Sequence, residues 1–136
     1  MPVDTFASAL ADWASKEAGV TLDDSFKQSA SDYITSLKSG VPDRLEQRKM
    51  AAILVAYATA KVRKLGRTVA TDKDFETALN DVQPLWMSTE FERHKDVVTS
   101  PFPSVPLPLT PVPRPEKVGA LAEKLPKSLQ LLFLRP

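Results

Sequence analysis

The side chains that could act as an acid, a base or a metal ligand are few and stand apart in the sequence. The only histidine, His94, lies in the segment FERHKD with acidic residues close by. An imidazole that titrates near neutral pH could exchange protons there. A single histidine on a polar helix is usually a solvated side chain, however, and we expect no catalytic role for it.

Acidic pairs occur at the expected starts of two helices. Asp23 and Asp24 form one pair, and Asp72 and Asp74 form the other. Carboxylates at a helix start accept hydrogen bonds from free backbone N–H groups and oppose the helix dipole, whereas a divalent cation needs further oxygen ligands nearby. We therefore interpret both pairs as helix-start residues and predict no metal site.

Other catalytic chemistries lack the residues that they need. The chain has no cysteine, which excludes a disulfide and a thiolate nucleophile. Its serines stand in no nucleophile motif, and its four glycines are isolated, so that no phosphate-binding loop is expected. We expect a protein that is not an enzyme and that needs no cofactor.

The composition of the chain changes near Val98. Residues 1–96 carry 13 basic and 15 acidic residues, whereas residues 97–136 carry 5 basic and 2 acidic residues and nine of the twelve prolines. The net charge of +1 argues against a strongly basic nucleic-acid binder. Because the first ten residues lack a secretory signal and no apolar run reaches the roughly 18–20 residues of a membrane span, we expect a cytoplasmic protein without a membrane partner.

Apolar residues recur at helical spacing over most of residues 1–98, which predicts an all-α fold with a small bundle of four or five helices. The segment MAAILVAYATA is apolar on every side, so the helix that contains it should lie at the centre of the bundle. The predicted helices run from Asp4 to Gly19, from Thr21 to Gly40, from Asp43 to Leu65, from Thr71 to Pro84 and for a short stretch from Ser88, and Pro115 opens another near the C-terminus.

The segment GRTVATDKDF, residues 66–75, links the predicted central helix to the next one. Gly66 suits the left-handed conformation that ends many helices. Thr68 and Val69 are β-branched and favour extended backbone, and Thr71 can then cap the following helix. We therefore expect a helix, a short strand-like step and a new helix.

This order of elements resembles the second half of a histone fold, in which a long helix, a short extended loop and a last helix follow one another. ALADWASKEAGVTLDD is similar to the first helix and loop of that fold, and the resemblance covers residues 6–83. The glycine and proline of TSLKSGVPDRLEQRK depart from the pattern, because they would break the central helix in two. The resemblance implies phosphate contacts from Arg67 and its neighbours Arg63, Lys64 and Thr68.

The same residues also resemble the helical lid domain of AAA+ ATPases of the replicative helicase type, from SDYITSLKSG to DKDFETAL. Such a lid follows an ATPase core, and this chain has neither a P-loop nor room for that core. The lid resemblance therefore implies a stand-alone interaction module. An ordinary helical bundle with common capping residues explains the same segment, and the three interpretations remain open.

The sequence predicts a helical domain over residues 1–98, a proline-rich extended arm over residues 99–115 and a short amphipathic, apolar C-terminal element over residues 116–136. Because a pre-extended chain loses little entropy when it lies along a partner, we expect the arm and the C-terminal element to dock on a protein partner or a larger assembly. The sequence leaves open a homodimer or heterodimer, and a C-terminal element that folds back. The expected anchors are Phe102, Leu107, Leu109, Leu121, Leu125, Leu132 and Phe133.

The alternative function is that of a histone-like or replication-associated DNA-binding protein. Its candidate contacts are Arg63, Lys64, Arg67 and Thr68. Cations at the end of a helix also complement the helix dipole without any ligand, and residues 1–96 are slightly acidic. The sequence therefore favours the protein-binding function over the nucleic-acid-binding one.

Overall fold

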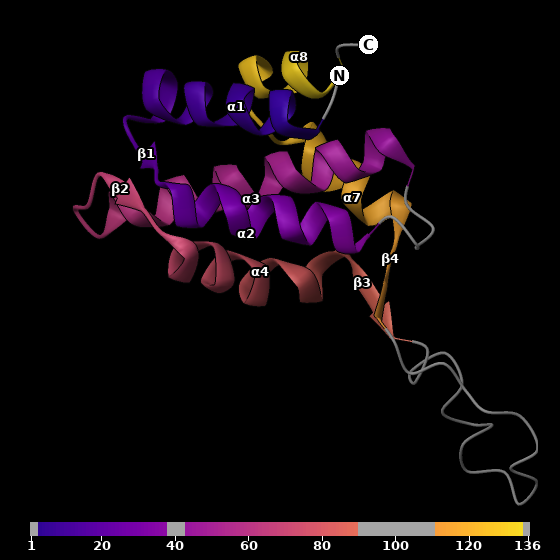
Figure 1. Cartoon of the computed structure of the whole chain (residues 1–136). Coiled ribbons are helices and arrows are strands. Elements are labelled where there is room, and N and C mark those ends of the chain that lie inside the picture. Colours follow the sequence, from indigo (N-terminus) through magenta and orange to yellow (C-terminus); the bar gives the residue numbers. More distant parts are fainter. Residues whose placement is uncertain (1–2, 38–42, 90–110, 135–136) are drawn as a thin grey trace, which may run out of the picture.

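A computed structural model describes residues 3–37, 43–89 and 111–134 of the chain (Figure 1). The described residues are mostly helical, consistent with the all-α prediction. In chain order the elements are α1 (Val3–Trp13), the π-helical turn η1 (Ala14–Ala18), β1 (Thr21–Leu22), α2 (Asp24–Ser36), α3 (Arg44–Lys64), β2 (Val69–Ala70), α4 (Asp72–Trp86), β3 (Met87–Thr89), β4 (Pro111–Pro113), α7 (Pro115–Glu123) and α8 (Lys127–Phe133).

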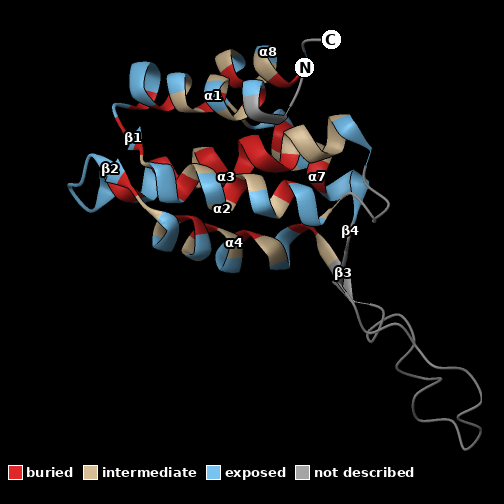
Figure 2. Ribbon diagram, viewed as in Figure 1, coloured by how far each residue is buried: buried red, intermediate tan, exposed pale blue. Residues whose placement is uncertain are grey.

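Helix α3 lies at the centre of the bundle, as its apolar middle predicts. It packs against α1, α2, α4, α7 and α8, and Figure 2 shows buried residues in the middle of the helix. Met50, Leu54, Ala58 and Val62 recur at a spacing of four and are each at most 1% exposed. Ala51 and Val55 are buried beside them, so the helix contributes apolar surface on more than one side.

Helices α2 and α3 each begin after an aspartate whose side chain caps a free backbone N–H. The Asp23 carboxylate accepts from the Phe26 N–H at 2.9 Å, and the Asp43 carboxylate accepts from the Glu46 N–H at 2.8 Å. Such caps satisfy donors that have no partner inside the helix. The prediction that Thr21 opens the second helix is wrong, because Thr21 belongs to β1 and the helix begins two residues after β1.

A short parallel pairing of β1 with β2 ties the two interhelical loops together. Thr21 pairs with Val69, and the Thr21 N–H donates to the Thr68 carbonyl at 2.8 Å. The strand-like step predicted after the central helix is therefore confirmed, with a partner that local sequence does not reveal. Gly66 has a φ of 75°, the left-handed conformation expected where α3 ends.

The predictions for the end of the fourth helix are wrong. Pro84 lies inside α4, which continues to Trp86. A proline costs a helix one hydrogen bond and adds strain, but the fully buried Trp86 side chain holds the last turn against the core. Ser88 lies in β3 and opens no helix there. The rest of that predicted helix, with Phe91 and His94, lies outside the described residues.

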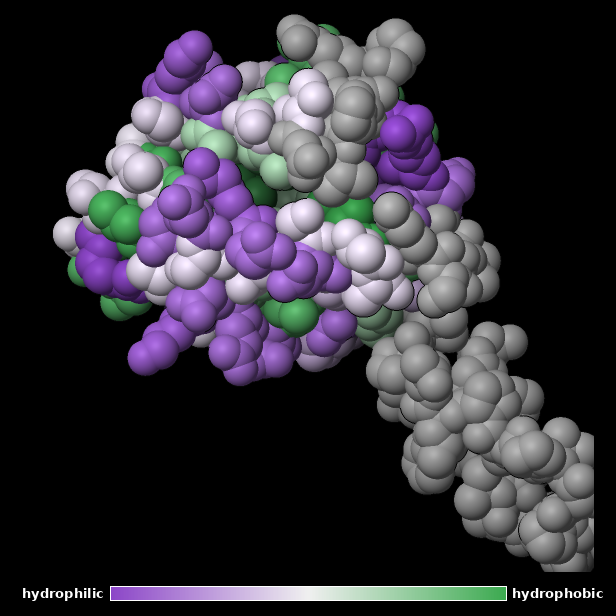
Figure 3. Space-filling view, in the orientation of Figure 1, coloured by the Kyte–Doolittle hydropathy of each residue, from purple (hydrophilic) through white to green (hydrophobic). Residues whose placement is uncertain are grey.

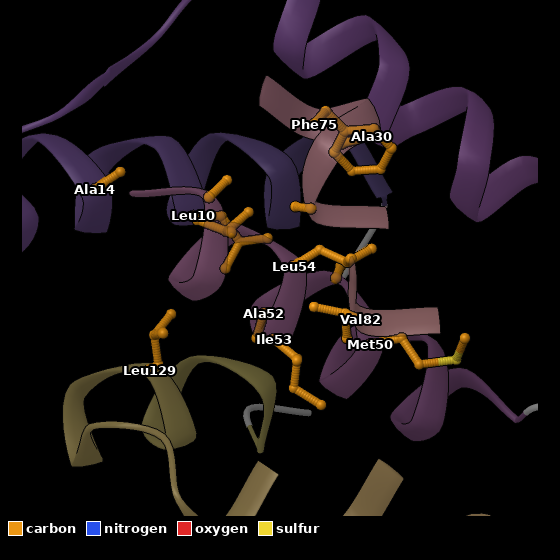
Figure 4. Close-up of a cluster of buried hydrophobic side chains, with 14 of the residues drawn as sticks. Leu10, Ala14, Ala30, Met50, Ala52, Ile53, Leu54, Phe75, Val82 and Leu129 are labelled. Atoms are coloured by element: carbon orange, nitrogen blue, oxygen red, sulfur yellow. The ribbon is translucent and has the colours of Figure 1, made fainter. Parts of the chain in front are cut away.

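The C-terminal helices complete the core of the bundle. Pro115 begins α7, as predicted, and a proline at this position fits because the first N–H groups of a helix have no internal partner. Val118 of α7 and Leu129 of α8 are 0% exposed. Figure 4 places Leu129 in one cluster with Leu10 of α1 and Ala52 of α3. The C-terminal element therefore folds back onto the body.

Candidate interaction surfaces

Strands β3 and β4 form a short antiparallel ladder at one end of the bundle, away from the β1–β2 pairing (Figure 1). Met87 pairs with Pro113 and Thr89 pairs with Pro111. Next to the ladder the Arg114 N–H donates to the Trp86 carbonyl at 2.7 Å. Thr89 and Pro111 thus lie on paired strands, so the two ends of the intervening sequence are held side by side.

The predicted partner anchors fall into two groups. Those of the C-terminal element pack on the chain itself: Phe133 is 3% exposed, and the three leucines of this group are partly buried against the core. Much of their apolar surface therefore packs within this chain, and Leu125, in the α7–α8 turn, also lines a hollow along α3. The anchors of the C-terminal element are Leu121, Leu125, Leu132 and Phe133. The anchors of the arm lie outside the described residues; they are Phe102, Leu107 and Leu109.

Three of the four candidate nucleic-acid contacts gather around one hollow at the β1–β2 end of the bundle. This basic hollow has a volume of about 550 Å³ and is lined by Arg63, Arg67 and Thr68 together with residues of η1. The turn η1 contributes Lys16 and Glu17. Sequence reasoning missed Lys16, because only the fold brings η1 to the end of α3. Lys64 is exposed and is not among the lining residues.

Arg67 is engaged by an acid of the following helix. Its Nη2 lies 2.5 Å from the Asp74 Oδ1, and its Nη1 donates to Oδ2 at 3.1 Å. The Arg67 guanidinium is the main cause that lowers the pKa of Asp74, and the N–H of Thr71 at 2.8 Å adds to the effect. The Asp74 carboxylate in turn raises the pKa of Arg67. The pair joins the β2 loop to the start of α4 and takes up most of the bidentate capacity of Arg67.

A second hollow, which we name the α3 groove, runs along one side of α3 and has a volume of about 510 Å³. Ile53, Ala56 and Ala60 of α3 line it at helical spacing. Trp13 forms part of one side, and its Nε1 donates to the Ser128 Oγ at 2.8 Å. The groove therefore has an apolar lining in which at least one aromatic wall is held in place by a hydrogen bond.

Tyr57 also lines the α3 groove, and α4 holds its hydroxyl. The hydroxyl donates to the Asp81 carboxylate, which also accepts from the Lys61 Nζ at 3.0 Å. The hydrogen bond to Asp81 raises the pKa of Tyr57, and Tyr57 and Lys61 lower the pKa of Asp81. These polar contacts fix the Tyr57 ring, so a ligand entering the groove would meet a surface that is largely preformed.

The described residues of α2 and α4 present a mainly hydrophilic face. Figure 3 shows that hydrophilic side chains predominate on this side of the molecule. Exposed ionisable residues there include Asp32, Lys73 and Glu76. The described apolar hollow therefore lies along α3 beside α1 and the α7–α8 turn.

The titratable groups of the described residues include a phenol whose hydroxyl is buried. Burial raises the pKa of Tyr33 to about 12, so its phenol stays protonated at neutral pH. No group of three or more His, Asp or Glu side chains within residues 3–37, 43–89 and 111–134 is arranged to hold a metal ion. His94 lies outside these ranges.

Comparison of the chain with protein-family models, curated proteins and solved structures finds no significant match. The resemblances to a histone fold and to an ATPase lid therefore stay predictions. In the described ranges, no helix combines the length and the apolar character that a membrane crossing requires. The β3–β4 ladder, the basic hollow and the α3 groove are the features of the structure that bear on function.

Proposed function

We propose that the protein is a non-enzymatic interaction or assembly subunit that captures a partner protein through its proline-rich arm. The observation that carries the proposal is the β3–β4 ladder, in which Thr89 pairs with Pro111. The ladder holds Thr89 and Pro111, which flank residues 90–110 in the sequence, at one end of a packed helical body. The anchors in this segment are Phe102, Leu107 and Leu109.

A segment fastened at both ends loses less conformational freedom on binding than a free tail of the same length. The prolines between the apolar anchors restrict φ and lower that loss further. The apolar residues of the segment have too few neighbours in sequence to form a core of their own. Together these properties support recognition of an extended segment by an apolar surface of a partner.

The packing of α7 and α8 changes how the arm must be tested. A deletion of residues 99–136 would remove Val118, Leu129 and Phe133, which are buried. The loss of these core contacts would destabilise the body, so a failure to capture a partner would have two explanations. The test therefore has to change the arm and leave the C-terminal helices intact.

A suitable variant replaces Phe102, Leu107 and Leu109 by serine in the full chain. We expect the partner captured from an extract of the native host to be lost, with the thermal unfolding of the body unchanged. The matched control replaces Leu131 and Leu134 of the C-terminal region, which are 61% and 59% exposed, by serine. Equal capture by the triple serine variant and the native chain would reject the proposal.

Nucleic-acid binding is the second candidate function, because the fold adds Lys16 to Arg63 and Arg67 around the basic hollow. Phosphate contacts make binding fall with salt, with a logarithmic slope of about −0.9 per phosphate neutralised. If the hollow binds a DNA duplex, Lys16→Ala with Arg63→Ala should flatten this slope by about 2. The same change at exposed Lys117 and Lys127 is the control, and no retention of duplex at low salt would exclude the function.

A further inference from the structure

We infer that the α3 groove is a second docking surface, and that its occupant is an acidic, amphipathic helix of a partner protein. The groove runs from Ile53 to Arg63 along α3. Ten residues of helix rise about 15 Å, which equals about three turns of a helix lying alongside. The groove is thus long enough to hold apolar residues from successive turns of such a partner.

The lining favours a helix over an added β-strand. Ala56 and Ala60 lie one turn apart on α3, and side chains this small let the axis of a second helix approach closely. A peptide that binds as an added β-strand needs an unpaired strand edge, whereas the lining comes from helices and the α7–α8 turn. Trp13 and Tyr57 supply aromatic surface for the anchoring side chains.

The positive charge at the rim of the groove favours a partner that carries negative charge. Arg63 and Lys124 line the groove, and Lys16 lies in the adjoining basic hollow, which shares Glu17 and Arg63 with the groove. None of these three cations forms a salt bridge within the described residues. Glu17 is the one acidic side chain that lines either hollow. The rim is therefore net positive, and carboxylates flanking an apolar stripe would complement it.

The apolar lining distinguishes this occupant from a nucleic acid. A phosphate backbone gains from cations and has no apolar side chain to place against Ala56 and Ala60, whereas an amphipathic helix uses both the lining and the rim. The inference is independent of residues 90–110. Replacement of the arm should leave binding at the groove unchanged, so failure of the arm proposal and failure of this one are distinguishable.

The test uses a display library of random peptides about 16 residues long, selected on the full chain. We expect the selected peptides to carry apolar residues at helical spacing flanked by Asp or Glu. In Ala60→Arg a long side chain fills the groove, and affinity for these peptides should fall at least about tenfold. The matched control is Ala120→Arg, which makes the same change at an exposed alanine of α7 outside the groove; it should alter affinity less than about twofold.

Several results would overturn the inference. These are a library that yields no binder, binders without enriched acidic residues, or equal affinity of binders for the native chain and Ala60→Arg. Binding of a DNA duplex that is unchanged or stronger in Ala60→Arg, with no peptide binder, would assign the rim to nucleic acid. A native dimer that Ala60→Arg converts to a monomer would assign the groove to a second copy. Urea unfolding of both arginine variants shows whether any loss of affinity reflects a loss of folding.

Discussion

The first prediction concerns Leu129, which belongs to α8 and is 0% exposed. If α8 is part of the core, Leu129→Ala removes a buried isobutyl group and leaves a cavity. Comparable Leu→Ala changes cost about 2–5 kcal/mol, of which the transfer of apolar surface explains only part. For a domain of this size, a loss of about 3 kcal/mol lowers the melting temperature by roughly 10 °C.

The control for this prediction lies two residues away on the same helix. Leu131 is 61% exposed, and Leu131→Ala should change the free energy of unfolding by no more than about 0.5 kcal/mol. Urea titration of both variants, followed by circular dichroism at an unchanged slope, measures the difference. Equal stability of the two variants would refute the conclusion that the C-terminal element folds back onto the body.

Two further predictions concern the loop between α3 and α4 and its surroundings. Gly66→Ala should destabilise the protein by about 1 kcal/mol because Gly66 has a φ of 75°. Gly119→Ala inside α7, where an added Cβ meets no atom within 4 Å, should instead stabilise it by about 0.5–1 kcal/mol. Urea titration measures both changes, and changes of the same sign would contradict the prediction. Arg67 lowers the pKa of Asp74 below 3.8 in the folded chain, so the ionised carboxylate stabilises the fold above that pH. The stability difference between the native chain and Asp74→Asn should therefore shrink as the pH falls below about 4. A difference that stays constant on acidification would count against the ion pair.

The sequence predicted the helical architecture well where local chemistry decides it. The apolar middle of α3, the left-handed Gly66 and the proline at the start of α7 each act within one or two turns of the chain, and the structure has each as predicted. The β-branched residues after Gly66 likewise predicted the extended step. These features depend on neighbouring residues alone.

The sequence did not predict helix boundaries that depend on contacts between residues distant in the chain. Thr21 looked like a helix cap, but its backbone pairs with Val69, 48 positions away. Pro84 looked like a helix end, but the burial of Trp86 keeps the last turn of α4 in place. In each case a tertiary contact outweighs a local preference, and no local pattern records that contact.

The candidate surfaces divide in the same way. Arg63 and Arg67 were identified by their positions after the central helix, but Lys16 joins them only through the fold. The α3 groove was not foreseen, because Trp13, Ala60 and Lys124 come from separate elements. Phe133 was a candidate partner anchor, with folding back onto the body left open by the sequence, and it is buried in the chain's own core.

The most direct test of the proposed function compares partner capture by the native chain with capture by a chain lacking residues 90–110, which include the expected anchors Phe102, Leu107 and Leu109. In the second chain a Gly-Ser-Gly-Ser link joins Thr89 to Pro111, so the β3–β4 ladder and the helices α7 and α8 are kept. Both tagged chains are used to recover proteins from an extract of the native host, and mass spectrometry quantifies what each retains. We expect the shortened chain to unfold at the same temperature and to lose the main partner; recovery of the same partner in equal amount would contradict the proposed function.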